Sequence, residues 1–199
     1  MTHRLFVAAW IGEPMRREAE QLLVTLRETN ADVKWVEPKN LHLTIRFLGS
    51  IDASDVPRIE ERVARDVESM APFSFGLGKL GSFGSRGSPN VIWAAVHPGE
   101  KEMVEVASRV EKGLVSLGVV EPVTRAFRAH ATLGRSRSPR GAKPLAGLLE
   151  ELSFRSAPEL LKEVSLVESK LTPKGPEYVT RMRFPFAGIA SRNSSTTKE

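Results

Sequence analysis

The sequence predicts an α+β fold in which several short strands alternate with helices. Two observations indicate this class. Runs of β-branched and apolar residues, such as 41–49 and 91–96, are short and bounded by glycine, proline or polar residues, which is typical of strands. Between such runs, leucines at helical spacing in 14–28 and capping residues at the start of 54–70 indicate helices. Short interleaved strands favour antiparallel or mixed sheets.

Each expected element has a local reason. Residues 4–10 form an apolar strand, and Pro14 suits the first turn of the helix that follows it. Ser54 or Asp55 can cap the second helix, and Gly118 ends a third helix over 101–117. Residues 81–90 are rich in glycine and serine and are expected to be a loop. The other predicted elements are strands at 33–36, 73–80, 127–134, 163–171 and 178–184, and a short helix at 145–151.

The domain organisation follows from length and composition. A chain of 199 residues fits one domain, which we expect over 1–188, and the polar tail 189–199 is expected to be disordered. Cysteine is absent, so a disulfide framework and a thiolate metal site are excluded. No apolar run approaches the roughly 20 residues that span a bilayer. We therefore expect a cytoplasmic protein without a membrane partner.

The charge permits a polyanionic partner without demanding one. Lys and Arg number 29 against 24 Asp and Glu, which gives a formal charge of +5 and a pI near 9.7. The excess is modest, but basic residues cluster between Arg125 and Lys143. This cluster is compatible with RNA binding and equally with a solvated loop.

Two matching four-residue strings are the strongest functional signal. His42-Leu43-Thr44-Ile45 and His130-Ala131-Thr132-Leu133 both read His, apolar, Thr, apolar, and both lie in predicted strands. Side chains alternate between the faces of a strand, so each His shares a face with the Thr two positions later. The apolar residues between them face the other way, toward a core. Each string thus offers one imidazole and one hydroxyl on a common surface.

Two imidazoles and two hydroxyls suit the hydrolysis of a cyclic phosphodiester. One imidazole can take a proton from water while the other protonates the leaving oxygen, because histidine titrates near neutral pH. Threonine hydroxyls can donate to the phosphate oxygens, where charge accumulates. Neither string has a carboxylate or a second histidine at ligand spacing, so no metal and no cofactor are expected.

These residues resemble the paired H-x-T-x motifs of the 2H phosphoesterase superfamily, and more closely the RNA 2′,3′-cyclic phosphodiesterases, also called 2′-5′ RNA ligases. HLTIRFLG and FRAHATLGR carry the resemblance, which covers roughly residues 4–186. It implies two pseudo-symmetric lobes of antiparallel sheet with outer helices around a central cleft. It also implies that His42 gives a proton to the leaving ribose oxygen, that His130 takes one from water, and that Thr44 and Thr132 hold the phosphate.

Strand parity adds two basic candidates for phosphate binding. Arg46 lies at His42 plus four and Arg128 at His130 minus two, so both share the face of the histidines if the strands are regular. Arg135 has the opposite parity and reaches that face only past a bulge, so it ranks lower. Trp35 and Trp93 are interpreted as packing residues rather than base-stacking ones.

The sequence therefore predicts an enzyme that opens an RNA 2′,3′-cyclic phosphate to a 2′-phosphate, with reverse 2′-5′ ligation as a second activity. The regiochemistry comes from the resemblance. Its expected partners are cyclic-ended RNAs such as tRNA fragments, and the chain is expected to be a monomer. Two alternatives stay open: a phosphodiesterase for a cyclic nucleotide or nucleotide-sugar cyclic phosphate, and a module of the same fold that binds nucleotide or RNA without turnover.

Overall fold

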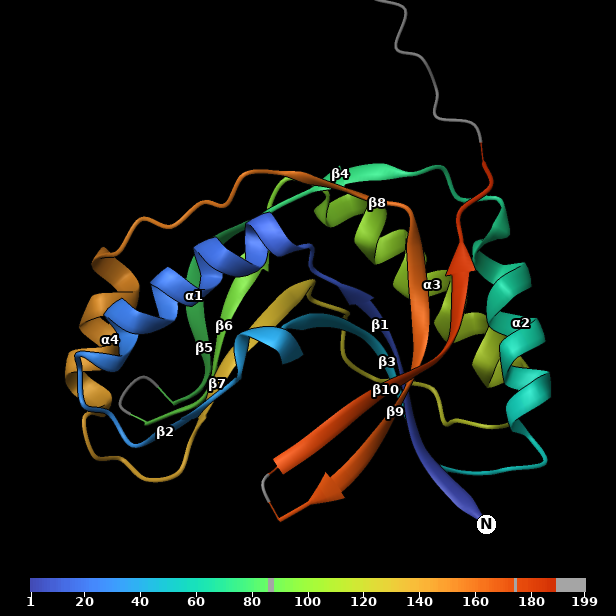
Figure 1. Ribbon diagram of the computed structural model, residues 1–199, viewed down its shortest axis with the longest axis horizontal. Coiled ribbons are helices and arrows are strands. Elements are labelled where there is room, and N and C mark those ends of the chain that lie inside the picture. The colour runs from blue at the N-terminus through green and yellow to red at the C-terminus, as the bar shows by residue number, and fades with distance from the viewer. Residues whose placement is uncertain (86–87, 174, 189–199) are drawn as a thin grey trace, which may run out of the picture.

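The computed structural model describes residues 1–85, 88–173 and 175–188, and the tail 189–199 lies outside the described residues. The α+β class is confirmed (Figure 1). The helices are α1 (Glu13–Arg27), α2 (Val56–Glu68), α3 (Glu100–Ser116), α4 (Ala142–Glu151) and the 3-10 turn η1 (Pro38–Asn40). The strands are β1 (Thr2–Trp10), β2 (Val33–Trp35), β3 (His42–Asp52), β4 (Phe73–Phe75), β5 (Leu77–Ser85), β6 (Ser88–Val96), β7 (His130–Ser136), β8 (Glu159–Leu161), β9 (Glu163–Thr172) and β10 (Gly175–Pro185).

The main sheet consists of two antiparallel halves that meet at one pair of residues. Its strand order is β10-β9-β1-β3-β7-β6-β5, and β2 pairs with the C-terminal end of β7. Within each half the strands pair over many residues, but β3 and β7 pair only at Leu43 and Ala131. The two expected lobes are thus the two halves of the sheet, with four strands each. One half contains the motif strand β3 and the other contains the motif strand β7. β4 and β8 form a separate two-stranded sheet.

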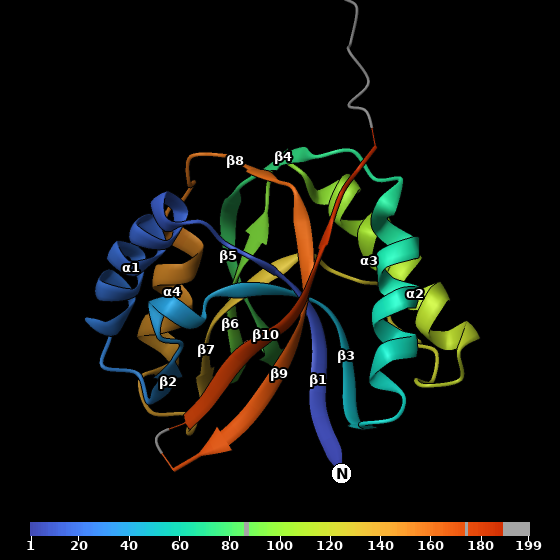
Figure 2. The same cartoon turned by 45° about the vertical axis from the view of Figure 1, so that its right-hand side comes forward.

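The helices cover one face of this sheet in two groups. In both views α1 and α4 lie beside the half that contains β5 and β6, and α2 and α3 lie beside the other half (Figures 1 and 2). Their apolar stripes are buried: on α2 these are Val56, Ile59, Val63 and Val67. Leu43 and Ala131 belong to the same core and are fully buried. No helix in the described part of the chain is long and apolar enough to cross a membrane.

Most predicted elements are present, with shifted boundaries. The strand expected over 73–80 is broken at Gly76 into β4 and β5, and strands extend into the loop expected over 81–90. The strand expected from 127 begins only at His130. The expectation was wrong there because 127–129 form no ladder. The 3-10 turn η1 and the short strand β8 were not predicted.

Two bulges change which residues share a face. In β3, Arg46 pairs with Val7 and Thr44 with Ala8, so Ile45 has no partner on β1. In β7, Gly134 pairs with Ile92 and Thr132 with Trp93, which leaves Leu133 without a partner on β6. An extra residue reverses the alternation of all side chains beyond it. The bulges therefore turn Phe47 and Arg135 toward the face of the two histidines.

Gly134 provides a test of how β2 is held on β7. A Cβ at this position would come within 2.6 Å of Val33 Cγ1 and 2.8 Å of Trp35 Cε3. We expect Gly134→Ala to lower the free energy of unfolding by about 1–3 kcal/mol, because both β2 side chains must move out of the core. Denaturant unfolding measures it.

Gly147→Ala is the matched control, because nothing lies within 4 Å of a Cβ built at this position, which is inside α4. It should stabilise by about 0.5–1 kcal/mol, as alanine is the better helix former. Equal stability of Gly134→Ala and the parent would contradict the described packing of β2.

Candidate active site

His42 and His130 begin the two strands that meet at the centre of the sheet. The antiparallel pairing of Leu43 with Ala131 sets His42 across from Thr132 and Thr44 across from His130. Because Leu43 and Ala131 face the core, the four polar residues lie on the opposite face, here called the histidine face. The structure thus brings together the two predicted histidines and the two predicted threonines, all four half-buried.

The two imidazoles are held in the same way. His42 Nδ1 lies 2.7 Å from the carbonyl oxygen of Asn40, and His130 Nδ1 lies 2.7 Å from that of Arg128. A carbonyl oxygen only accepts, so each Nδ1 donates its proton and each neutral ring keeps an unprotonated Nε2. His42 Nε2 is 3.1 Å from Thr44 Oγ1. Both rings therefore present the nitrogen that can exchange protons with a substrate.

Aromatic side chains surround each histidine. The rings of Phe6, Trp10 and Tyr178 have centroids 5.1 to 5.5 Å from that of His42. Phe83 lies 5.1 Å and Trp93 6.4 Å from His130. Sequence reasoning missed most of these residues, although the alternation of Phe6 and Trp10 along β1 could have placed them on one face.

The two tryptophans singled out in the sequence have different positions. Trp35 packs against the core and over Gly134, in agreement with a packing role. Trp93 lies instead on the histidine face, where its indole extends over Gly81 of β5. Gly81 is needed there, because a Cβ would come within 2.5 Å of the indole ring.

Burial sets the titration of both histidines. It lowers the pKa of His42, an effect partly opposed by the hydrogen bond to Asn40 and reinforced by the charge of His130. It likewise lowers the pKa of His130, opposed by the bond to Arg128 and reinforced by the charge of Arg135. The mutual effect of the two imidazoles means that one protonated ring favours a neutral partner, as an acid–base pair requires.

Arg46 does not share the histidine face, and the parity prediction for it was wrong. The bulge at Ile45 turns its side chain toward α3, where the guanidinium pairs with Glu111. It also donates to the carbonyl oxygen of Glu121, and Glu111 accepts from the backbone N–H of Val123. Arg46 thus ties the first motif strand to the segment that leads to the second motif.

Arg128 precedes β7, and its neighbours Phe127 and Ala129 pack against the core, as the predicted alternation requires. Its expected place on the opposite side agrees with this burial, and its binding of phosphate stays a prediction. Its backbone carbonyl orients His130, and its side chain is exposed. Arg135, ranked lower in the sequence, is the arginine that the bulge in β7 turns to the histidine face. Burial raises the pKa of Tyr178, and the charge of Arg135 partly opposes this rise.

The acidic and histidine side chains do not gather into a metal-binding group. Within the described residues, no three of His, Cys, Asp or Glu cluster as ligands for a metal ion. That the reaction needs no metal stays a prediction. The chemistry available from the side chains of the histidine face is proton transfer and anion binding.

Comparison with known proteins shows the family of the chain. A family model described as LigT like Phosphoesterase matches residues 11–93. A protein named RNA 2′,3′-cyclic phosphodiesterase from Archaeoglobus fulgidus is 35% identical over 176 residues, which are 88% of this chain and 96% of that protein. The crystal structure of TT0787 of Thermus thermophilus has a TM-score of 0.79 at 25% identity, covering 94% of this chain and all of that one. Escherichia coli LigT in apo form has a TM-score of 0.74 at 20% identity, covering 93% and 98%.

The paired motifs on one face of a split antiparallel sheet define a phosphoesterase of the 2H superfamily. With the relatives above, the chain belongs to the LigT-like phosphoesterase family.

Replacing Arg46 tests its structural role. The side chains of Arg46 and Glu111 are only 14% and 20% exposed. Arg46→Ala would leave the Glu111 carboxylate without its cation, and we expect the free energy of unfolding to fall by about 1–3 kcal/mol. Arg17→Ala is the control, since its pair with Glu13 is 74% and 65% exposed and should contribute less than about 0.5 kcal/mol. If Arg46→Ala left the stability unchanged and weakened RNA binding, Arg46 would be a substrate-binding residue instead.

Proposed function

We propose that the protein is an RNA 2′,3′-cyclic phosphodiesterase that opens the cyclic end to a 2′-phosphate by acid–base catalysis with His42 and His130. The observation that carries this proposal is the pair of imidazoles on one face, each with Nδ1 bound to a carbonyl oxygen and Nε2 left unprotonated in the neutral ring. The relatives named RNA 2′,3′-cyclic phosphodiesterase, at up to 35% identity over most of their length, support the substrate class.

The proposed step balances with two proton transfers. Water attacks the phosphorus while His130 Nε2 takes its proton, and the bond from phosphorus to the ribose 3′ oxygen breaks. His42 in its imidazolium form gives the Nε2 proton to that oxygen. Thr44, Thr132 and the nearby Arg135 stabilise the charge on the phosphate oxygens. Family resemblance supplies the choice of acid and base, since the two rings have the same backbone partner.

Ligation is the same displacement with a different nucleophile. A 5′-hydroxyl that takes the place of water would join to the cyclic phosphate as a 2′-5′ linkage. Water at roughly 55 M favours hydrolysis unless a second RNA end is held in place. We therefore propose hydrolysis as the main reaction.

Removing either imidazole is the most direct mutational test. We expect His42→Ala and His130→Ala each to lower kcat for a cyclic-ended RNA by about 10²- to 10⁴-fold, the usual effect of losing one acid–base group. KM should change little. Product mapping should place the phosphate on the 2′ oxygen.

His97→Ala is the control, because this histidine is exposed and follows the end of β6. It should keep parental turnover. All assays contain excess EDTA. Loss of parental activity in EDTA with recovery on adding one divalent metal, or near-parental turnover of a His42 or His130 variant, would contradict the two-histidine proposal.

The pH dependence follows from the lowered pKa values. Burial favours the neutral form of each histidine, so both pKa values lie below 6.5, and one protonated ring with one neutral ring is most populated between them. We expect a bell-shaped profile of kcat/KM with its maximum below pH 6.5. Arg135→Gln removes a positive charge near His130 and should shift one limb to higher pH.

Arg140→Gln is the matched control for that shift. This exposed arginine lies beyond β7, where its nearest carboxylate is Asp32 at 4.0 Å. Its profile should match the parent. A parental kcat/KM that peaks well above pH 6.5 would be inconsistent with the described burial of the histidines. Identical pH profiles for Arg135→Gln and the parent would be inconsistent with the described effect of the Arg135 charge.

A further inference from the structure

Lys34 and Arg135 are neighbours on the histidine face. They are directly paired across β2 and β7, and side chains paired in this way point to the same side of a sheet. The residues on either side of Lys34, Val33 and Trp35, pack against the core. Alternation along β2 therefore directs Lys34 away from the core, to the side of the two histidines.

Arg135 connects this pair to the reacting groups. The bulge at Leu133 places it on the same face as His130 and Thr132. Its charge adds to the effect of burial that lowers the pKa of His130, and it partly opposes the rise that burial causes in the pKa of Tyr178. The Tyr178 ring lies 5.2 Å from that of His42. Arg135 thus stands between the catalytic pair and Lys34.

Lys34 extends the basic surface outward from Arg135. Its Nζ lies 3.9 Å from the position of a Cβ built on Gly175, at the start of β10. In both ribbon views the hairpin of β9 and β10 projects toward the end of the sheet that carries β2 (Figures 1 and 2). The ammonium therefore lies where β2 and the hairpin approach each other, beyond Arg135 as seen from His130.

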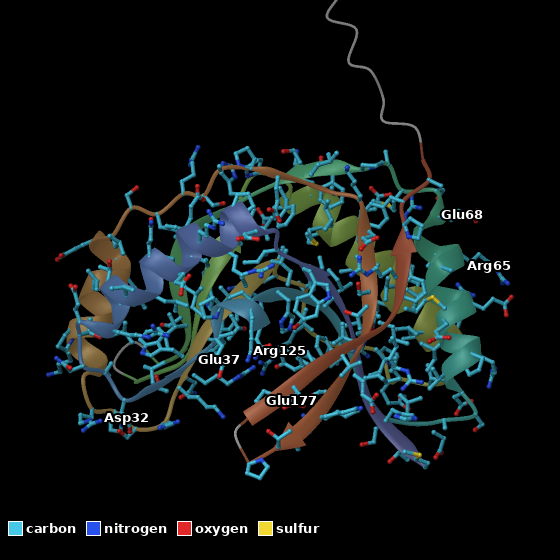
Figure 3. All side chains as sticks on the ribbon, in the orientation of Figure 1. Asp32, Glu37, Arg65, Glu68, Arg125 and Glu177 are labelled. Atoms are coloured by element: carbon cyan, nitrogen blue, oxygen red, sulfur yellow. The ribbon has the colours of Figure 1, made fainter. Side chains whose placement is uncertain are left out.

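Two nearby cations have carboxylate partners, and this pair differs from them. Lys39 pairs with Glu37 at 2.9 Å, which raises the pKa of Lys39, and the charge of Glu177 raises it further. Figure 3 labels both carboxylates, Glu37 and Glu177. Arg140 has Asp32. Among the described residues, Lys34 and Arg135 form no ion pair, although two cations side by side on a sheet repel each other. A bound anion would relieve this repulsion.

We propose that Lys34, next to Arg135 on its outer side, binds the phosphate on the 5′ side of the terminal nucleotide, so that the site distinguishes an RNA chain from a free cyclic nucleotide. This inference rests on the proposed function. A nucleotide that carries a 2′,3′-cyclic phosphate has its 5′ oxygen as the remaining link to the chain. The next phosphate therefore lies beyond the sugar, and Lys34 lies beyond Arg135. A lysine ammonium is a compact positive charge, and charge is enough to bind a phosphodiester. The rigid bidentate donors of an arginine are not required.

Two small substrates that differ by one phosphate test the proposal. The first is a nucleoside 2′,3′-cyclic phosphate, and the second is the same molecule with a 5′-phosphate. Lys34→Ala should lower kcat/KM about 10-fold on the 5′-phosphorylated substrate, through KM, and less than about twofold on the other. Lys34→Arg should retain most of the preference for the 5′-phosphorylated substrate. With a cyclic-ended oligonucleotide, Lys34→Ala should reduce the slope of log(kcat/KM) against log salt by about 0.7.

Lys39→Ala is the matched control, since Lys39 is an exposed lysine nearby whose charge is already paired. It should leave both substrates and the salt slope unchanged. Equal losses of Lys34→Ala on the two substrates, or no loss on either, would overturn the assignment of Lys34. A parent that turns over neither small substrate nor the oligonucleotide would overturn the proposed function itself, and the two failures are thus distinct.

Discussion

The single pairing of Leu43 with Ala131 is the constraint on which the rest of the site depends. It is the only point at which β3 and β7 pair within the described residues, and both side chains are fully buried. Because it joins the middle residues of the two motifs, it fixes the spacing of two imidazoles and two hydroxyls at once. Either half of the sheet alone would carry one histidine and one threonine, which cannot supply an acid and a base together.

The same contact explains why the position between His130 and Thr132 carries no polar group. Ala131 faces the core, so a change of size there concerns packing rather than chemistry. The carbonyl oxygens of Asn40 and Arg128, each two residues before a histidine, repeat one local geometry in both halves. The pseudo-symmetry of the sequence motifs thus extends to the orientation of the rings.

The two halves differ in the residues that follow the motifs, and this difference bears on substrate binding. Each strand has a bulge after the threonine, and the residue it turns to the histidine face is Phe47 in β3 but Arg135 in β7. One half therefore offers an exposed aromatic ring next to Phe6, and the other offers a cation next to Lys34. The symmetric acid–base pair thus has an aromatic ring on one side and cations on the other. This difference favours one orientation of a bound nucleotide.

Alternation along regular strands was enough to predict the fold class, both histidines and both threonines on a common face. It failed for Arg46 and Arg135, because a bulge depends on the partner strand and leaves no mark in the residues of β3 or β7 themselves. Arg128 lies outside the ladder, which begins at His130 rather than at 127, but it alternates with the core-facing Phe127 and Ala129 as predicted. Tyr178 and Phe83 come from strands remote in sequence, so only the strand order brings them to the histidines.

The central claim is that two backbone carbonyls hold both rings so that Nε2 of each is free to exchange protons with substrate. Nitrogen-15 NMR of the imidazoles, at a pH above both pKa values, measures this directly in the parental protein. The account predicts that His42 and His130 are both protonated on Nδ1 and unprotonated on Nε2, whereas exposed His97 follows the tautomer balance of free histidine. A proton on Nε2 of either His42 or His130 in the neutral state would contradict it.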